Sequence, residues 1–171
     1  MTSNGTSALG RRLEKFGLEL SGAKTRLIPF SRHHLAGKTS FEVLGFAFRW
    51  GKDRKGKDHL QRRTARKKLR TSLKRFTAWG KENRHLRLPV LFQRLNAKLR
   101  GYYNYYGVHG NAASLQEFFN KAIRMLLKWL NRRSQRHSYT WQGYTAVLER
   151  FKVARPRIVG RPKTRLAALK A

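Results

Sequence analysis

The side chains best suited to chemistry in this sequence are cations, because 40 Lys and Arg stand against 8 Asp and Glu and give a formal net charge of +32. A two-metal nucleotidyl-transfer site needs carboxylates that hold two ions about 3.5–4 Å apart. No two of the acids form a close pair in a buried, β-rich segment, and we expect no catalytic residue. The acids are Glu14, Glu19, Glu42, Asp53, Asp58, Glu82, Glu117 and Glu149.

The sequence does not indicate a metal or cofactor site. It has no cysteine, which excludes disulfides, a Cys nucleophile and Cys-ligated zinc. The rings of the adjacent His33 and His34 diverge in a strand or a helix, so a metal site there is not expected. There is also no phosphate-cradling glycine loop of the P-loop kind. We therefore expect no cofactor.

Phosphate binding is the chemistry that this composition favours. The hydrophobic content of 40% and the aromatic content of 12% are too high for a disordered basic tail. A folded chain with so much positive charge is best balanced by a polyanion, of which nucleic acid is the commonest. A basic helix face is often only a solvated surface, but here few acids are present to pair with the cations.

Three segments carry the candidate nucleic-acid contacts. A helix expected over residues 64–80 has an apolar stripe opposite a basic face, the segment 100–107 reads RGYYNYYG, and the segment 127–136 reads LKWLNRRSQR. Exposed tyrosines can stack on bases, although two of the four in 102–106 are equally explained as core residues. The candidate RNA-binding residues are Arg62, Arg63, Arg66, Lys67, Arg70, Lys74, Arg94, Lys98, Arg100, Tyr102, Tyr103, Asn104, Tyr105, Lys128, Asn131, Arg132, Arg133 and Arg136.

The elements that position these residues are predicted to form an α+β fold that is mainly α. In the first part, residues 1–8 are expected to be disordered and residues 9–20 to form a helix. Strands are expected over 24–30 and 41–50, and a turn over 51–58 leads to a third strand at 58–62 that completes a β-hairpin.

The second part is predicted to be all-helical. The helix over 64–80 ends at Gly80, the next runs over 87–107 with Pro89 in its first turn, and a third runs over 115–133. A capping box at Ser114 and Glu117 is expected to begin the third helix, and Thr140 to cap a last helix that reaches Phe151. Beyond Pro156 we expect a loose basic tail.

Neither a membrane span nor a secretory signal is predicted. No apolar run approaches the roughly 20 residues that a bilayer requires, and the opening MTSNGTSALG lacks a basic segment followed by an apolar one. With no cysteine either, we expect a cytoplasmic protein.

Four segments together resemble group II intron reverse transcriptase/maturases, in the order that the family has them. They are RRLEKFGLELSGAKTRLIPFSR (11–32), FEVLGFAFRWGKDRKGK (41–57), LNAKLRGYYNYYG (95–107) and LKWLNRRSQR (127–136). The resemblance implies a remnant of the reverse-transcriptase palm over 9–62, and a thumb or maturase-specific domain (domain X) over 63–152. A basic tail over 153–171 follows.

The resemblance also implies roles for single residues. Lys24 matches the lysine of the family's Lys-Thr-Arg segment near the incoming nucleotide. Leu44, Gly45 and Phe46 match a segment that resembles a primer grip. The thumb motif is matched by Arg100, Tyr102, Tyr103, Asn104, Tyr105 and Tyr106, and a later motif by Leu130, Asn131, Arg132, Arg133 and Ser134.

The sequence departs from this family where the catalytic Tyr-Ala-Asp-Asp segment is expected, because MTSNGTSALG has no aspartate. The chain thus resembles an N-terminally truncated member and is not expected to be an enzyme by itself.

Our first hypothesis is a module that binds group II intron RNA and assists its splicing. The alternatives are the thumb of a split reverse transcriptase with a separate palm chain, a non-functional remnant, or a non-specific DNA-binding or ribosome-associated protein. The oligomeric state stays open.

Overall fold

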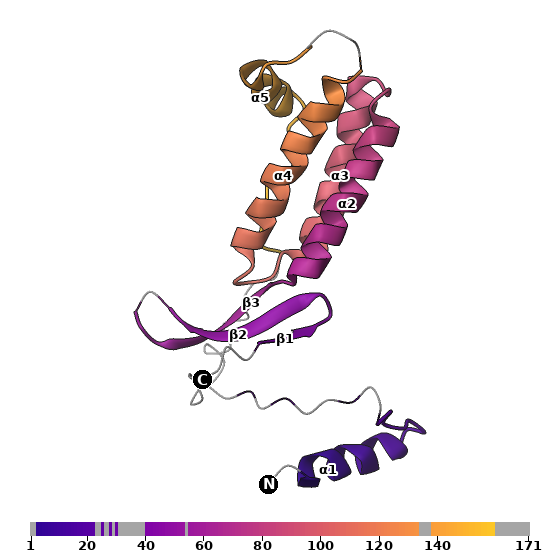
Figure 1. Cartoon of the computed structure of the whole chain (residues 1–171), viewed down its shortest axis with the longest axis vertical. Helices are drawn as coiled ribbons and strands as arrows, with labels where there is room; N and C mark the ends of the chain where they lie inside the picture. Colours follow the sequence, from indigo (N-terminus) through magenta and orange to yellow (C-terminus); the bar gives the residue numbers. More distant parts are fainter. Residues whose placement is uncertain are drawn as a thin grey trace, which may run out of the picture.

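The computed structural model describes residues 3–22, 25, 28, 30, 40–53, 55–133 and 138–159. Within these residues the order of elements is α1, β1, β2, β3, α2, α3, α4, α5. Figure 1 shows the long helices α2, α3 and α4 side by side, with the sheet at one end and α5 near the other. The predicted α+β, mainly α class is confirmed.

The three strands form an antiparallel sheet in chain order: β1 (Ser40–Val43), β2 (Phe46–Lys52) and β3 (Asp58–Thr64). The pairing of β2 with β3 confirms the predicted hairpin, which extends further than expected because Phe46 pairs with Thr64. The hairpin turn is held by Asp53, whose Oδ1 accepts hydrogen bonds from the amides of Lys55 and Lys57 at 2.8 and 2.9 Å.

The single strand expected over 41–50 is wrong, because a turn at Leu44 and Gly45 divides it into β1 and β2. Both residues have positive φ, 50° and 81°, which is the signature of a two-residue type I′ hairpin turn. A leucine rarely adopts this conformation, so the apolar run did not indicate the turn. The Gly45 carbonyl accepts from the amide of Ala65 at 2.9 Å and thereby joins the turn to the start of α2.

Helix α2 (Arg66–Asn83) does not end at Gly80 as predicted. Gly80 is buried, and a Cβ there would lie 3.1 Å from Cδ1 of Trp129. The glycine therefore makes room for the Trp129 indole of α4. The helix ends three residues later, where Nδ2 of Asn83 donates to the carbonyl of Trp79 at 2.9 Å.

Helices α3 (Leu88–Tyr106) and α4 (Ala112–Leu130) complete the bundle. Pro89 stands in the first turn of α3, as predicted. The capping box is wrong, because α4 begins at Ala112 and buries Ser114, while Glu117 pairs with Lys121 at 2.5 Å. Of the apolar stripe predicted for this helix, Leu127 is only partly buried, and the other members are buried as expected: Leu115, Phe118, Phe119, Ala122, Ile123, Leu126 and Leu130.

Helix α5 (Trp141–Arg150) begins at the predicted cap, because Oγ1 of Thr140 accepts from the amide of Gly143 at 3.2 Å. Its buried Tyr144 donates from the hydroxyl to the carbonyl of Ile123 in α4 at 3.2 Å. This bond and the burial of Leu148 fix α5 on the bundle.

Residues 151–159 form a segment, here called the C-terminal strap, that runs back along α3. The amide of Ala154 donates to Oδ1 of Asn96 at 2.8 Å, and its carbonyl accepts from the Tyr103 hydroxyl at 3.0 Å. The amide of Val159 donates to the carbonyl of Gly107 at 2.7 Å. The structure thus differs from the loose tail expected beyond Pro156, because this backbone bond holds Val159 against the end of α3.

Helix α1 (Ser3–Glu14) begins and ends earlier than the predicted helix at 9–20, so residues 3–8 are helical where disorder was expected. A turn with Gly17 at φ +66° follows. The expected apolar stripe does not extend the helix because it is not buried: Leu9 and Phe16 are 48% and 74% exposed. The strand predicted over 24–30 lies mostly outside the described residues, and Thr25, Ile28 and Phe30 are not in a strand.

Candidate nucleic-acid interface

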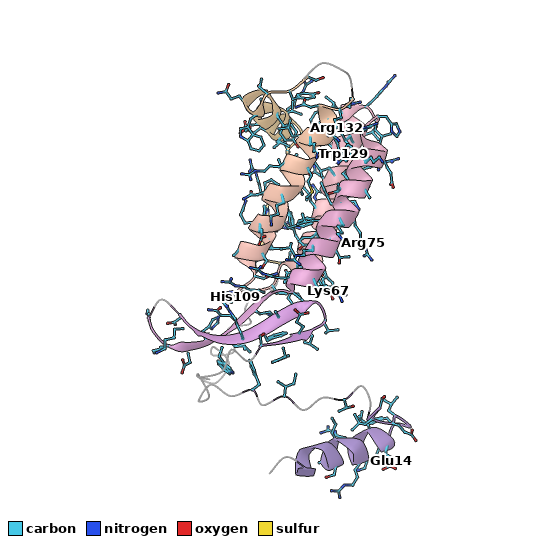
Figure 2. The ribbon with its side chains drawn as sticks, in the orientation of Figure 1. Glu14, Lys67, Arg75, His109, Trp129 and Arg132 are labelled. Atoms are coloured by element: carbon cyan, nitrogen blue, oxygen red, sulfur yellow. The ribbon has the colours of Figure 1, made fainter. Side chains whose placement is uncertain are left out.

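The largest run of predicted cations lies on α2. Arg66, Lys67, Arg70 and Lys74 are all exposed, while Leu69, Leu73 and Phe76 of the same helix are buried. Figure 2 shows Lys67 near the end of α2 that adjoins the sheet, and Arg75 further along the same helix. We call the set Arg66, Lys67, Arg70, Lys74 and Arg75, with Lys98 of α3, the α2 basic face.

The start of α2 is electrostatically unfavourable for a helix. Its first three residues are Arg66, Lys67 and Lys68, and no acid stands in the first turn. The positive end of the helix dipole lies here. An anion at this position stabilises a helix by about 0.3–1 kcal/mol, and a cation destabilises it by a similar amount. Arg66 and Arg70, four residues apart, add a like-charge repulsion. A bound anion would relieve both effects.

Helix α3 contributes two of its predicted residues to this surface. Nη1 of Arg94 donates to Oδ1 of Asn83 at the end of α2, at 3.0 Å. The ammonium group of Lys98 lies 5.5 Å from the ring centre of Trp79. Both cations therefore sit beside α2.

Arg100 and Asn104 are exposed but do not join the α2 basic face. Arg100 follows Lys98 by two residues, which is about 200° around a helix, and Asn104 lies one turn beyond Arg100. Because Lys98 faces α2, the structure separates this pair from the other predicted cations.

Of the predicted tyrosines, Tyr103 is a correction. Its side chain is fully buried and its hydroxyl donates to the strap at Ala154, so it cannot stack on a base. Burial raises the pKa of Tyr103 well above its ordinary value of 10. Tyr102 is half-buried and stacks on Phe118 with ring centres 3.7 Å apart, so its role is mainly packing.

Tyr105 is the exposed tyrosine of this group, with 55% of its surface accessible. Its ring stacks on Phe46 of the sheet at 6.1 Å, and its hydroxyl donates to the carbonyl of Leu44 at 2.9 Å. Tyr106 packs edge-on against the same Phe46 at 5.5 Å. The end of α3 thus holds the β1–β2 turn, and Tyr105 keeps more than half of its surface accessible to a ligand.

A second group of cations lies at the end of the bundle away from the sheet, as Figure 2 shows for Trp129 and Arg132. The guanidinium groups of Arg84 and Arg132 lie 5.7 and 5.4 Å from the Trp129 ring centre. Arg133 donates to the carbonyl of Leu86 at 2.7 Å. We call Arg84, Trp129, Arg132 and Arg133 the distal cluster, which the exposed Lys128 adjoins.

Asn131 has a structural role that accounts for its side chain. Its Oδ1 accepts from the amide of Tyr139 and its Nδ2 donates to the carbonyl of the same residue, both at 2.9 Å. The side chain thus closes the connection between α4 and α5. The predicted Lys24 and Arg136 lie outside the described residues, as does the His33–His34 pair, at which no metal site was expected.

The remaining predicted cations lie at the end of β3. Arg63 is exposed, and the half-buried Arg62 has its Nη2 3.5 Å from the carbonyl of His109. The prediction missed Arg75, which borders a cavity of about 190 Å³ between α2 and α3 together with Lys98 and Tyr102. In the sequence, Arg75 stands directly before the core residue Phe76 and was not assigned to the basic face. Its place beside Lys98 in this cavity is what shows that it belongs to that face.

Among the described residues no group of three His, Cys, Asp or Glu could hold a metal ion. In the same part of the chain, no helix has the length and apolar character that crossing a membrane requires.

Residues 54–146 match the model of one protein family, described as group II intron, maturase-specific domain. Searches of the curated proteins and of the solved structures give no match. The matched residues contain β3, the three long helices and the first part of α5, and hence the α2 basic face and the distal cluster. The match covers more than half of the 171 residues, and the chain therefore belongs to the group II intron maturase-specific domain family, which gives it a role in intron splicing.

Proposed function

We propose that this chain binds structured group II intron RNA through the α2 basic face and stabilises the fold in which the intron splices. The RNA performs the transesterifications in this proposal. The protein neutralises phosphates where RNA helices approach one another, and its own residues carry out no bond-breaking step.

The observation that supports the proposal is the shortage of partners for the exposed cations. In the part of the chain that the structure describes, Lys121–Glu117 is the one salt bridge between side chains. The α2 basic face carries six cations, and the start of α2 repels positive charge. A protein surface of this kind gains most from a ligand with closely spaced negative charges.

The shape of the surface suits an extended polyanion. Helix α2 has 18 residues, which corresponds to about 27 Å of helix. Its cations recur along most of that length, and Arg94 and the distal cluster continue the positive charge beyond its end. A backbone with regularly spaced phosphates can therefore make several contacts at once.

A filter-binding titration against salt tests the proposal directly. If all six cations of the α2 basic face contact phosphates, the logarithm of affinity should fall against the logarithm of salt concentration with a slope of about −4 to −5. A slope near zero would rule out this mode of binding. Competition by an unrelated RNA duplex and by DNA then measures whether intron RNA is preferred, and equal competition by all three would contradict specific recognition.

A further inference from the structure

A cavity of about 280 Å³ lies on the α4–α5 side of the bundle, and none of the candidate RNA-binding residues lines it. This volume is close to the roughly 300 Å³ at which small-molecule pockets begin, so it suits one planar group. Its lining combines an apolar floor with cations and one amide: Phe119, Asn120, Ile123, Arg124, Trp141, Thr145, Leu148 and Arg155.

Trp141 supplies an exposed aromatic face at the edge of this cavity. It is the first residue of α5 and is 52% exposed, although tryptophan normally buries a large area. The Thr140 cap before it and the bond from Thr145 Oγ1 to its carbonyl at 2.9 Å fix its backbone. An exposed indole that a well-held helix start presents can stack on a nucleobase.

Two arginines and an asparagine surround this aromatic face. The guanidinium group of Arg155 lies 5.4 Å from the ring centre of Phe119, and both Arg155 and Arg124 are exposed. Oδ1 of Asn120 accepts from Nε2 of Gln116 at 2.8 Å, while its Nδ2 donates to no acceptor among the described residues. No acid lines the cavity.

The cavity also continues the positive surface of α2 across α4. Lys121 lines the groove between α2 and α4 together with Arg66, Arg70 and Glu117, with which Lys121 forms a salt bridge. Arg124 follows Lys121 by three residues, which places the two on neighbouring lines of the same helix. A strand whose phosphates lie on the α2 basic face can therefore pass from Arg66 and Arg70 over Lys121 to Arg124 at the α4–α5 cavity.

We propose that the α4–α5 cavity binds one unpaired nucleotide of the RNA. The base stacks on Trp141, Asn120 bonds to the edge of the base, and Arg124 and Arg155 hold the adjoining phosphates. This inference rests on the proposed function, because the α2 basic face supplies most of the affinity. The cavity adds selectivity for a bulged or flipped-out base over a continuous duplex.

The test compares two RNA hairpins that differ only by one bulged adenosine, titrated by fluorescence anisotropy at fixed salt. The unaltered chain should bind the bulged hairpin more tightly. Trp141→Ala should reduce that preference by about 5- to 150-fold, the effect of losing one base–aromatic stack, and should leave affinity for the paired hairpin and its salt slope unchanged. Trp141→Phe should restore most of the preference.

Arg124→Ala, with Arg150→Ala as the matched control, tests the phosphate contacts. Both arginines are exposed, but Arg150 does not line the cavity. Arg124→Ala should lower the bulge preference and Arg150→Ala should not. Failure of the unaltered chain to bind either hairpin would refute the proposed function. Equal binding of the two hairpins, or an unchanged preference in Trp141→Ala, would overturn the cavity inference alone. The cavity inference would also be overturned if a polyglutamate peptide displaced the bulged hairpin from the unaltered chain but not from Trp141→Ala, because the cavity would then bind an acidic peptide.

Discussion

Thr64 and Asn111 exchange two hydrogen bonds across 47 residues of sequence, both within the buried interior. The amide of Thr64 donates to Oδ1 of Asn111, and Nδ2 of Asn111 donates to Oγ1 of Thr64, each at 2.8 Å. The same Nδ2 donates to the carbonyl of Tyr106 at 2.8 Å. The Asn111 side chain thus joins the end of β3 to the connection between α3 and α4. Thr64, its partner in β3, stands two residues before the start of α2.

Replacing Asn111 by Ala should therefore destabilise the domain strongly. The buried amide of Thr64 would lose its acceptor, and an unsatisfied buried donor costs about 1–3 kcal/mol. Urea unfolding followed by circular dichroism measures the loss. The control is Asn104→Ala, which removes the same side chain from an exposed position on α3. Similar unfolding free energies for the two variants would contradict the role given to Asn111.

Asn111 also shows what could not be predicted from the sequence. An asparagine between two helices indicates a loop, but its partners lie far away in the chain, and no local pattern identifies them. The same is true of Asn96, which holds the strap, and of Asn131, which closes the α4–α5 connection. Asn131 was predicted to contact RNA because its motif places it among arginines, whereas its amide is engaged within the protein.

The parts of the fold that depend on local periodicity were predicted well. The apolar stripe of α4 and the Thr140 cap are examples, because in each case the signal and its effect lie within a few residues. Gly80 was misread as a helix end because its role is to admit Trp129 from another helix. For the candidate site, the exposure of the α2 cations followed from the helix period, while the burial of Tyr103 depended on the strap.

Two glycines, Gly101 within α3 and Gly107 at the C-terminal cap of α3, give a second prediction. A Cβ at Gly107 would lie 2.2 Å from the carbonyl oxygen of Tyr103 and 2.7 Å from that of Arg157, whereas at Gly101 it would meet nothing within 4 Å. Gly107→Ala should displace the strap and lower the melting temperature. Gly101→Ala should stabilise the helix by about 0.5–1 kcal/mol. Thermal unfolding of both variants checks this, and a stabilised Gly107→Ala would show that the strap does not pack as described.

The α2 basic face predicts how salt dependence changes on mutation. Replacing Arg66, Lys67, Arg70 and Lys74 together by Ala should make the slope of log affinity against log salt shallower by about 3 to 4. The matched control removes four exposed cations from other elements, Arg11, Arg12, Lys15 and Lys55. Filter binding of intron RNA compares the two variants. An equal change in both would mean that total charge, and not this face, governs binding.

Buried tyrosines predict a loss of stability in alkali. Burial raises the pKa of Tyr144 well above 10, because the folded interior disfavours the phenolate. Its contribution is fully present below pH 10, the ordinary tyrosine value, and is lost as pH rises above it. Tyr144→Phe should reduce the fall of unfolding free energy between pH 10 and 11 by up to about 1.4 kcal/mol.

Urea unfolding at pH 9, 10 and 11 measures how steeply the free energy of unfolding falls with pH. This slope separates the effect of titration from that of the lost hydrogen bond to Ile123, because loss of the bond alone lowers stability equally at every pH. The control is Tyr105→Phe, which removes an exposed hydroxyl. If Tyr144→Phe kept the full slope of the unaltered chain, another group would be responsible for the alkaline loss.

The distribution of acids predicts that this chain alone does not synthesise DNA. Nucleotidyl transfer by the two-metal route needs carboxylates that hold both ions, and the acids within the described elements lie on different ones: Glu14 on α1, Glu42 on β1, Asp58 on β3, Glu82 on α2, Glu117 on α4 and Glu149 on α5. Primer extension on an RNA template with Mg²⁺ should give no product, although the same preparation should retain the template in a binding assay. Incorporation that elutes with the chain through gel filtration would contradict the prediction. It would also require acids of this chain to meet at one point, which the separation of those six residues on the described elements opposes.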